Sequence, residues 1–263
     1  MKLAFVIPVK ELKDFALKAK AIKNFGYQGA ELAIQNPKKI NLAKLKEIIK
    51  KTGLEVPAIA TGSAYQKEGI SLASPEIKIR KKAIQRIKDQ VEFAKNFDSL
   101  VIIGLIRGNI EGSSVGEKRL AASLKECSRF SQDRGVRLVL EAINRYETDF
   151  LHTLDEVGNF VRKWEIQNCG ILADVFHMNI EEVSLEKAIK NAASKIWHIH
   201  LADSNRLAPG LGHIDFKSFF AIIKKVAYQK YFTAEIQYLP NFLKSAELTI
   251  KYLKKYAPLE DRL

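Results

Sequence analysis

The chain alternates between short apolar runs and longer amphipathic segments. Eight continuous apolar runs predict buried strands at residues 3–9, 29–34, 56–60, 100–104, 137–142, 169–175, 196–202 and 231–236. Continuous rather than alternating apolar runs are typical of parallel strands that are covered on both faces. Segments between them carry apolar residues at helical spacing, as at residues 15–26, 42–53, 82–97 and 219–230. Eight strand–helix units predict a closed (β/α)8 TIM barrel in the α/β class rather than an open sheet.

Length and turn residues agree with this fold. The chain has 263 residues, and a (β/α)8 barrel typically takes about 250. Gly26 and Gly53 directly follow helical segments, where glycine commonly ends a helix, and Ser74–Pro75 predicts the start of another helix. Because no low-complexity linker or break in composition appears, we expect one domain over residues 1–263.

The charge is strongly positive, with a formal net value of +13. Lysines are interleaved with acidic residues in the amphipathic segments, which indicates solvated helix faces rather than a nucleic-acid surface. The first apolar run is broken by Lys10 and Glu11, so it predicts a strand and not a signal peptide. No run approaches the roughly 18 apolar residues of a membrane span. Cys127 and Cys169 are too few for a disulfide framework, and we expect a cytoplasmic protein.

Ionisable residues stand at the ends of the last four predicted strands. They are Glu141, Asp174, His200 and Glu235. The C-terminal ends of the strands form the catalytic face of a (β/α)8 barrel. A charged group after an apolar run is costly to bury unless it is paired or bound to metal. Three carboxylates and one imidazole favour a divalent ion such as Mn²⁺, Mg²⁺ or Co²⁺ over a structural zinc site.

Each of these residues also has a structural interpretation. A carboxylate at a strand end often caps a helix or forms a salt bridge, and Asp174 is placed to cap the following turn. His200 alone is compatible with a buried core histidine, and so is His198. Because side chains alternate along a strand, both histidines point to the same side, with His198 deeper as a support or core residue. The occurrence of all four residues on consecutive strands favours a functional site.

The residue set also suggests a reaction. Two glutamates on opposite walls of a pocket, Glu141 and Glu235, are suited to removing a proton from one face of a carbon and returning one to the other face. A metal that chelates a ketone and its neighbouring hydroxyl stabilises the enediolate in between. The outcome is epimerisation. A single base that moves the proton between two carbons gives aldose–ketose isomerisation instead.

Several motifs resemble the D-tagatose 3-epimerase family, within the wider xylose isomerase-like barrels. The matching segments are LEAINRYETDFLHT (140–153), ADVFHMNIEE (173–182) and HIHLADSNRLAPGLGHIDF (198–216), with AEI (234–236) and GYQGAELAI (26–34). The C-terminal segments are the specific ones. The resemblance extends over the whole chain and implies a keto-sugar substrate and assembly into a homo-oligomer, either a dimer or a tetramer.

The resemblance also implies roles for individual residues. The four strand-end residues bind one divalent metal, typically Mn²⁺, with Co²⁺ or Mg²⁺ as alternatives. Glu141 and Glu235 are also the acid/base pair. His177 and Arg206 contact the carbonyl side of the substrate, and Glu147 binds its hydroxyls near C1 and C2. For Glu147 and Arg206 a salt bridge within the loops is the structural alternative.

Arg107 distinguishes this chain at the fourth strand, whose end reads VIIGLIRGN. A guanidinium there is suited to bidentate binding of a carboxylate or phosphate. The segment looks closest to the branch that epimerises 5-keto-L-gluconate to D-tagaturonate, so we expect a keto-sugar acid as substrate. The alternative is that Arg107 pairs with Glu111 on the rim.

Three other functions share this barrel type. A DNA-repair endonuclease with three zinc ions needs histidines in the first half of the barrel, and the chain has none before His152. A hydroxypyruvate isomerase uses a similar ligand set and stays open as an alternative. A non-catalytic sugar-binding barrel does not require two opposed bases, so the presence of Glu141 and Glu235 argues against it.

Overall fold

A computed structural model describes residues 1–256 and shows a closed barrel of eight parallel strands in chain order. Each strand pairs with the next, and the first pairs with the last through Phe5 and Ala234. The strands are β1 (Lys2–Pro8), β2 (Gly29–Ala33), β3 (Ala58–Ala60), β4 (Leu100–Ile103), β5 (Leu138–Glu141), β6 (Cys169–Asp174), β7 (Ile196–Leu201) and β8 (Tyr231–Ala234). The predicted (β/α)8 fold is therefore confirmed.

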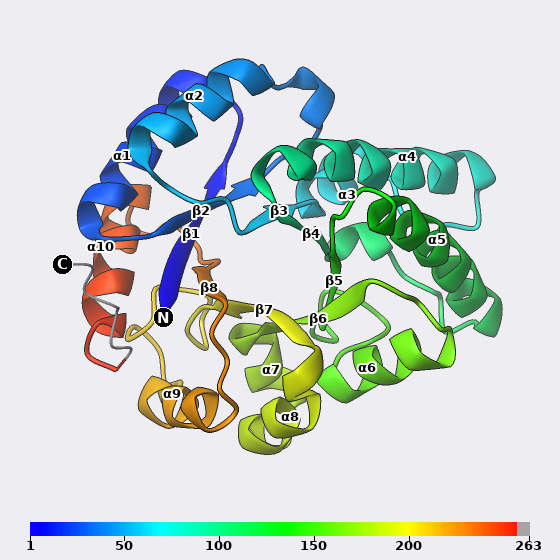
Figure 1. Ribbon diagram of the computed structural model, residues 1–263. Coiled ribbons are helices and arrows are strands. Elements are labelled where there is room, and N and C mark those ends of the chain that lie inside the picture. Colours follow the sequence, from blue (N-terminus) through cyan, green and yellow to red (C-terminus); the bar gives the residue numbers. More distant parts are fainter. Residues whose placement is uncertain (257–263) are drawn as a thin grey trace.

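Helices surround the barrel on the outside (Figure 1). The α-helices are α1 (Leu12–Phe25), α2 (Leu42–Thr52), α3 (Gly62–Glu68), α4 (Ile77–Ala94), α5 (Ser114–Gln132), α6 (Leu154–Lys163), α7 (Val175–Glu181), α8 (Leu185–Ala192), α9 (Phe216–Lys225) and α10 (Phe242–Leu253). Short 3₁₀ turns are η1 (Pro37–Lys39), η2 (Lys95–Phe97), η3 (Leu105–Arg107) and η4 (Ala193–Lys195). Within residues 1–256 no helix combines the length and the apolar character needed to cross a membrane.

Most predicted elements are found within a few residues of their expected bounds. Gly26 and Gly53 end α1 and α2 in the left-handed conformation, with φ of 102° and 64°. The helix predicted from Ser74–Pro75 begins later, at Ile77, because the Ser74 hydroxyl accepts a hydrogen bond from the Glu76 amide and forms a turn there. The predicted domain of residues 1–263 includes residues 257–263, which lie outside the described part of the chain.

Apolar side chains pack in two layers. One layer fills the space between strands and helices, and a second, smaller cluster inside the barrel contains Leu100, Ile102 and Leu172. Polar side chains are buried in the same structure, among them Glu31 and Thr233, both with no exposed surface. Because a buried polar group needs partners, the polar part of the barrel interior indicates where the chain holds its chemistry.

Candidate active site

The structure brings the four strand-end residues together. Glu141 ends β5, Asp174 ends β6, His200 lies in β7, and Glu235 directly follows β8. One ligand atom from each lies within 4.8 Å of the corresponding atoms of the others. Glu141, Asp174 and His200 are 7%, 0% and 1% exposed. Asp174 also caps α7, since its Oδ1 accepts a hydrogen bond from the Phe176 amide at 2.8 Å. The capping interpretation of Asp174 is therefore confirmed, and its Oδ2 is left facing the cluster, where its predicted role as a ligand stays a prediction.

The chemistry of this cluster fits a divalent cation. Nδ1 of His200 is buried and makes no hydrogen bond within residues 1–256. It lies 3.4 Å from a Glu235 oxygen and 3.8 Å from oxygens of both Glu141 and Asp174. Burial disfavours a charged His200 ring, but the charges of Glu31 and Glu235 outweigh it and raise the pKa of His200. Once a proton leaves Nδ1, one nitrogen and several oxygens are a suitable ligand set for Mn²⁺, Co²⁺ or Mg²⁺.

Two of the carboxyl groups are shifted in opposite directions. Burial, together with the negative charge of Glu235, raises the pKa of Glu141 to about 8. Burial also disfavours the ionised form of Glu235, but the positive charges of Arg206 and His200 outweigh it and lower the pKa of Glu235. Two neighbouring carboxyl groups whose pKa values differ are suited to separate acid and base roles.

Arg206, predicted to contact the substrate, lies over this cluster and forms ion pairs with two of its carboxylates. Its Nη1 donates to Asp174 at 3.2 Å, and its Nη2 donates to Glu235 at 2.5 Å. Arg206 has a backbone φ of 62°, which is uncommon for a residue other than glycine. Its backbone is fixed on both sides, because its amide donates to the Asp203 carbonyl and its carbonyl accepts from the Gln237 amide, each at 2.8 Å.

His177, on α7, completes this side of the site, and its ring orientation follows from Asn144. Oδ1 of Asn144 accepts a hydrogen bond from the Tyr146 amide, and its Nδ2 donates to Glu147 at 3.2 Å, which fixes the amide orientation. The same Nδ2 lies 2.7 Å from Nδ1 of His177. Nδ1 therefore accepts from this amide, which favours a proton on Nε2 of a neutral ring. Nη1 of Arg206, which can only donate, lies 3.2 Å from Nε2 and acts against that tautomer in the absence of substrate. Burial lowers the pKa of His177, which favours the neutral ring.

A cavity of about 230 Å³ opens over these groups and is lined by Glu141, Glu147, His177, Arg206 and Glu235, among others. Glu147 is exposed at the mouth. The predicted substrate-binding residues of the C-terminal half therefore share one cavity with three of the predicted ligands, Glu141, His200 and Glu235.

Arg107 does not line this cavity, which corrects the prediction that it contacts the substrate. Its side chain has no exposed surface and does not line the cavity. Nη1 donates to the backbone carbonyl of Glu141 at 2.6 Å, and Nη2 donates to the hydroxyl of Thr148 and to the carbonyls of Phe150 and Leu151. The alternative pairing with Glu111 is not observed either, since the guanidinium is occupied by these groups. Burial lowers the pKa of Arg107 to about 10.

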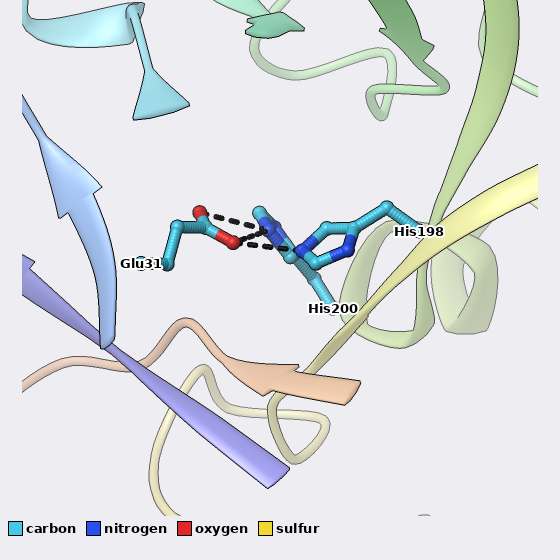
Figure 2. A group of neighbouring side chains, drawn as sticks. All are labelled: Glu31, His198 and His200. Carbon is cyan, nitrogen blue, oxygen red and sulfur yellow. Dashed lines mark hydrogen bonds and ion pairs between the residues drawn. The ribbon is translucent and has the colours of Figure 1, made fainter. Parts of the chain in front are cut away.

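Sequence reasoning missed Glu31. This glutamate lies in β2 and points across the barrel toward His198 and His200 of β7 (Figure 2). Burial disfavours its ionised form, but the charge of His200 and hydrogen bonds from both histidines bring the pKa of Glu31 down to about 2. The available signal was an acidic residue inside an apolar strand segment, GAELAI. His198, expected as a deeper support, bonds Glu31 at 2.8 Å.

Known proteins share the sequence pattern over most of the chain. The family model described as xylose isomerase-like TIM barrel matches residues 19–256. The L-ribulose 3-epimerase of Methylomonas sp. (strain DH-1) is 29% identical over 213 residues, which cover 80% of this chain and 74% of that enzyme. The D-psicose 3-epimerase of Enterocloster bolteae is 28% identical over 198 residues, which cover 73% of this chain and 64% of that enzyme.

The fold is shared with a solved structure as well. The D-allulose 3-epimerase from Methylomonas sp. in complex with D-allulose superposes with a TM-score of 0.85 at 21% identity, over 97% of each chain. At this identity the likeness describes the barrel and its strand order.

Proposed function

The chain belongs to the xylose isomerase-like TIM barrel family, and we propose that it is a metal-dependent ketose 3-epimerase that inverts the carbon next to the ketone. The observation that carries the proposal is the cluster of Glu141, Asp174, His200 and Glu235, whose ligand atoms lie within 4.8 Å of one another. The 3-epimerases among its relatives support the same reaction type.

The geometry assigns a division of work to these residues. Glu141 and Glu235 come from strands separated by β6 and β7, so they reach the cavity from different sides. One takes the proton from C3, and after the enediolate has formed the other delivers a proton to the opposite face. A bound divalent ion supplies Lewis-acid stabilisation of the negative charge that develops on the substrate oxygens. The Nε2–H of His177 and the guanidinium of Arg206 are placed to donate to the same oxygens.

The surroundings of the cavity support a proposal for the substrate class. A second cavity of about 400 Å³ shares Ala33 and Ser63 with the first, and Lys10, Lys39 and Lys67 line it. The three lysines are exposed. Because Arg107 is withdrawn from the site and Arg206 is paired with Asp174 and Glu235, we propose that these ammonium groups receive a carboxylate at the far end of a keto-sugar. We therefore propose keto-sugar acids such as 5-keto-L-gluconate beside neutral ketoses such as D-tagatose.

Isotope exchange tests the reaction. The enzyme is stripped with EDTA, reconstituted with Mn²⁺ or Co²⁺, and incubated in D₂O with D-tagatose, D-fructose, L-ribulose, hydroxypyruvate and 5-keto-L-gluconate. Deuterium at C3 together with the C3 epimer is the expected result. Deuterium confined to C1 or C2 with an aldose product assigns the protein to the hydroxypyruvate isomerase type instead. No activity without added metal is expected for the stripped enzyme.

A paired substitution separates an enzyme from a sugar-binding barrel. Glu141→Gln and Glu235→Gln each remove one base while the other ligands stay in place. We expect each variant to lose turnover by at least about 10²-fold. Metal content measured in parallel shows whether the variant still binds the ion. Unchanged turnover in both variants contradicts the proposed acid/base pair.

A further inference from the structure

We propose that Glu31 is a positioning residue: it holds the imidazole of His200 in the orientation and tautomer that metal binding needs. The inference rests on the proposed metal site and extends it to a residue on the far side of the barrel. Glu31 lies in β2, whereas the four proposed ligands come from the ends of β5 to β8.

The distances place Glu31 behind the imidazole as seen from the cluster. A carboxylate oxygen of Glu31 lies 3.1 Å from Nε2 of His200, and both carboxylate oxygens face this nitrogen in Figure 2. Nδ1, across the same ring, lies 3.4 Å from Glu235 and 3.8 Å from Glu141. One nitrogen of the ring therefore faces Glu31 and the other faces the proposed metal position.

The chemistry of the pair fixes the tautomer. An ionised carboxylate accepts hydrogen bonds and donates none, so Nε2 of His200 must carry a proton when it bonds Glu31. The lone pair of a neutral ring is then on Nδ1, the buried nitrogen without a hydrogen-bond partner. Histidines that bind metal are commonly oriented in this way, by a carboxylate on the other ring nitrogen.

Glu31 is buried against the two histidines of β7. Its exposed fraction is 0%, and its hydrogen bonds within the described residues go to His198, at 2.8 Å, and His200. Oε1 has no hydrogen-bond partner there. His198 contacts the same Oε2 as His200 and also the Thr233 hydroxyl at 3.1 Å, so it helps to hold the carboxylate in place. An apolar residue at this position of β2 would avoid the cost of burying a charge. The retained carboxylate is therefore accounted for by the imidazole it orients.

Metal affinity tests this role directly. Purified wild-type protein, Glu31→Leu and Glu31→Gln are stripped of metal and titrated calorimetrically with Mn²⁺ and Co²⁺. Leu removes the acceptor, so we expect its Kd to rise by about 10- to 100-fold. Gln keeps an acceptor oxygen without the charge, so the Kd of Glu31→Gln is expected to lie between those of wild type and Glu31→Leu. The visible spectrum of bound Co²⁺ should change in Glu31→Leu, because His200 no longer has a fixed orientation.

Ser99→Ala is the matched control. The Ser99 hydroxyl is buried and donates to the Val56 carbonyl at the opposite end of the barrel, where β3 and β4 begin. This variant is expected to lower the melting temperature while its metal Kd stays at the wild-type value. If Glu31 were only structural, its variants would behave in the same way.

The outcomes separate the two proposals. Equal Kd values and Co²⁺ spectra in wild type and both Glu31 variants overturn the positioning role and leave the metal site intact. A wild-type protein that binds neither ion overturns both. If Glu31→Leu does not fold, Glu31→Gln decides by the same two readouts, and a Kd within the error of wild type overturns the inference.

Discussion

Arg107 donates a hydrogen bond across 2.6 Å to the backbone carbonyl of Glu141, the glutamate proposed as both metal ligand and acid/base group. The same guanidinium reaches the carbonyls of Phe150 and Leu151 and the hydroxyl of Thr148, in the loop after β5. The buried guanidinium of Arg107 thus connects this loop, through hydrogen bonds, to the strand end that carries Glu141. Arginine suits this position because its planar donors reach several acceptors at once.

Arg107→Met is expected to destabilise the fold without changing substrate preference. The substitution removes the guanidinium hydrogen bonds to the carbonyls of Glu141, Phe150 and Leu151, of which the Leu151 carbonyl keeps a hydrogen bond from the Ile143 amide. We expect a loss of roughly 3 kcal/mol. Urea unfolding measures the loss. The ratio of kcat/KM for 5-keto-L-gluconate to that for D-tagatose should stay at the wild-type value, because the guanidinium does not line the cavity. A fall in that ratio would restore Arg107 as a carboxylate contact.

Asn144→Asp is expected to disable His177 without removing it. The wild-type amide donates to Nδ1 of His177 at 2.7 Å, which favours the ring proton on Nε2. A carboxylate in its place accepts, moves the proton to Nδ1 and leaves Nε2 without a donor for the substrate oxygen. We expect kcat/KM to fall by roughly 10²-fold with little change in metal affinity.

Arg145→Gln provides the comparison for that variant. Arg145 is the next residue and forms a salt bridge with Glu181 at 2.8 Å while its own side chain is 62% exposed. The Glu181 side chain is only 2% exposed, but it keeps the hydrogen bond from the Arg145 backbone amide at 2.7 Å, and Gln retains a side-chain donor. Activity within about twofold of wild type is therefore expected. If Asn144→Asp behaves like Arg145→Gln, the tautomer of His177 does not matter for the reaction.

The sequence predicted the parts of this site that depend on local signals. Each strand is a local apolar run, and Glu141, Asp174 and His200 stand where such runs end, so topology alone brings them together. Two residues needed the structure. Arg107 lies in a 3₁₀ turn, and the sequence does not show that this turn aims its side chain into the protein. Glu31 is visible as a charge in an apolar strand, but its partners are 167 and 169 residues away.

Metal binding and metal-free stability should depend on pH through Glu141. Its pKa of about 8 in the folded protein lies above the ordinary value of 4.5. The folded metal-free protein therefore holds a proton that the unfolded chain has lost between these values. The stabilisation that comes from this protonated Glu141 is complete below about pH 4.5 and is lost as the pH rises through about 8.

Two measurements check this pH dependence. Unfolding in EDTA between pH 5 and 9 should show wild-type stability falling relative to Glu141→Gln, which carries no titrating group there. Mn²⁺ affinity should rise over the same interval, because the ion must displace the proton from Glu141, by up to about tenfold per pH unit. Parallel stability curves for wild type and Glu141→Gln contradict the raised pKa.

The last prediction concerns the lysines beside the site. Lys10, Lys39 and Lys67 line the cavity that shares Ala33 and Ser63 with the active one. Their combined replacement by Gln should raise KM for 5-keto-L-gluconate by roughly three- to tenfold, since each exposed charge contributes a fraction of a kcal/mol. KM for D-tagatose should not change, because that sugar has no charge. Added salt should raise KM for the acid in wild type and much less in the triple variant, since it screens exposed charges. If KM for 5-keto-L-gluconate changes neither with the substitutions nor with added salt, the enzyme is assigned to neutral ketoses.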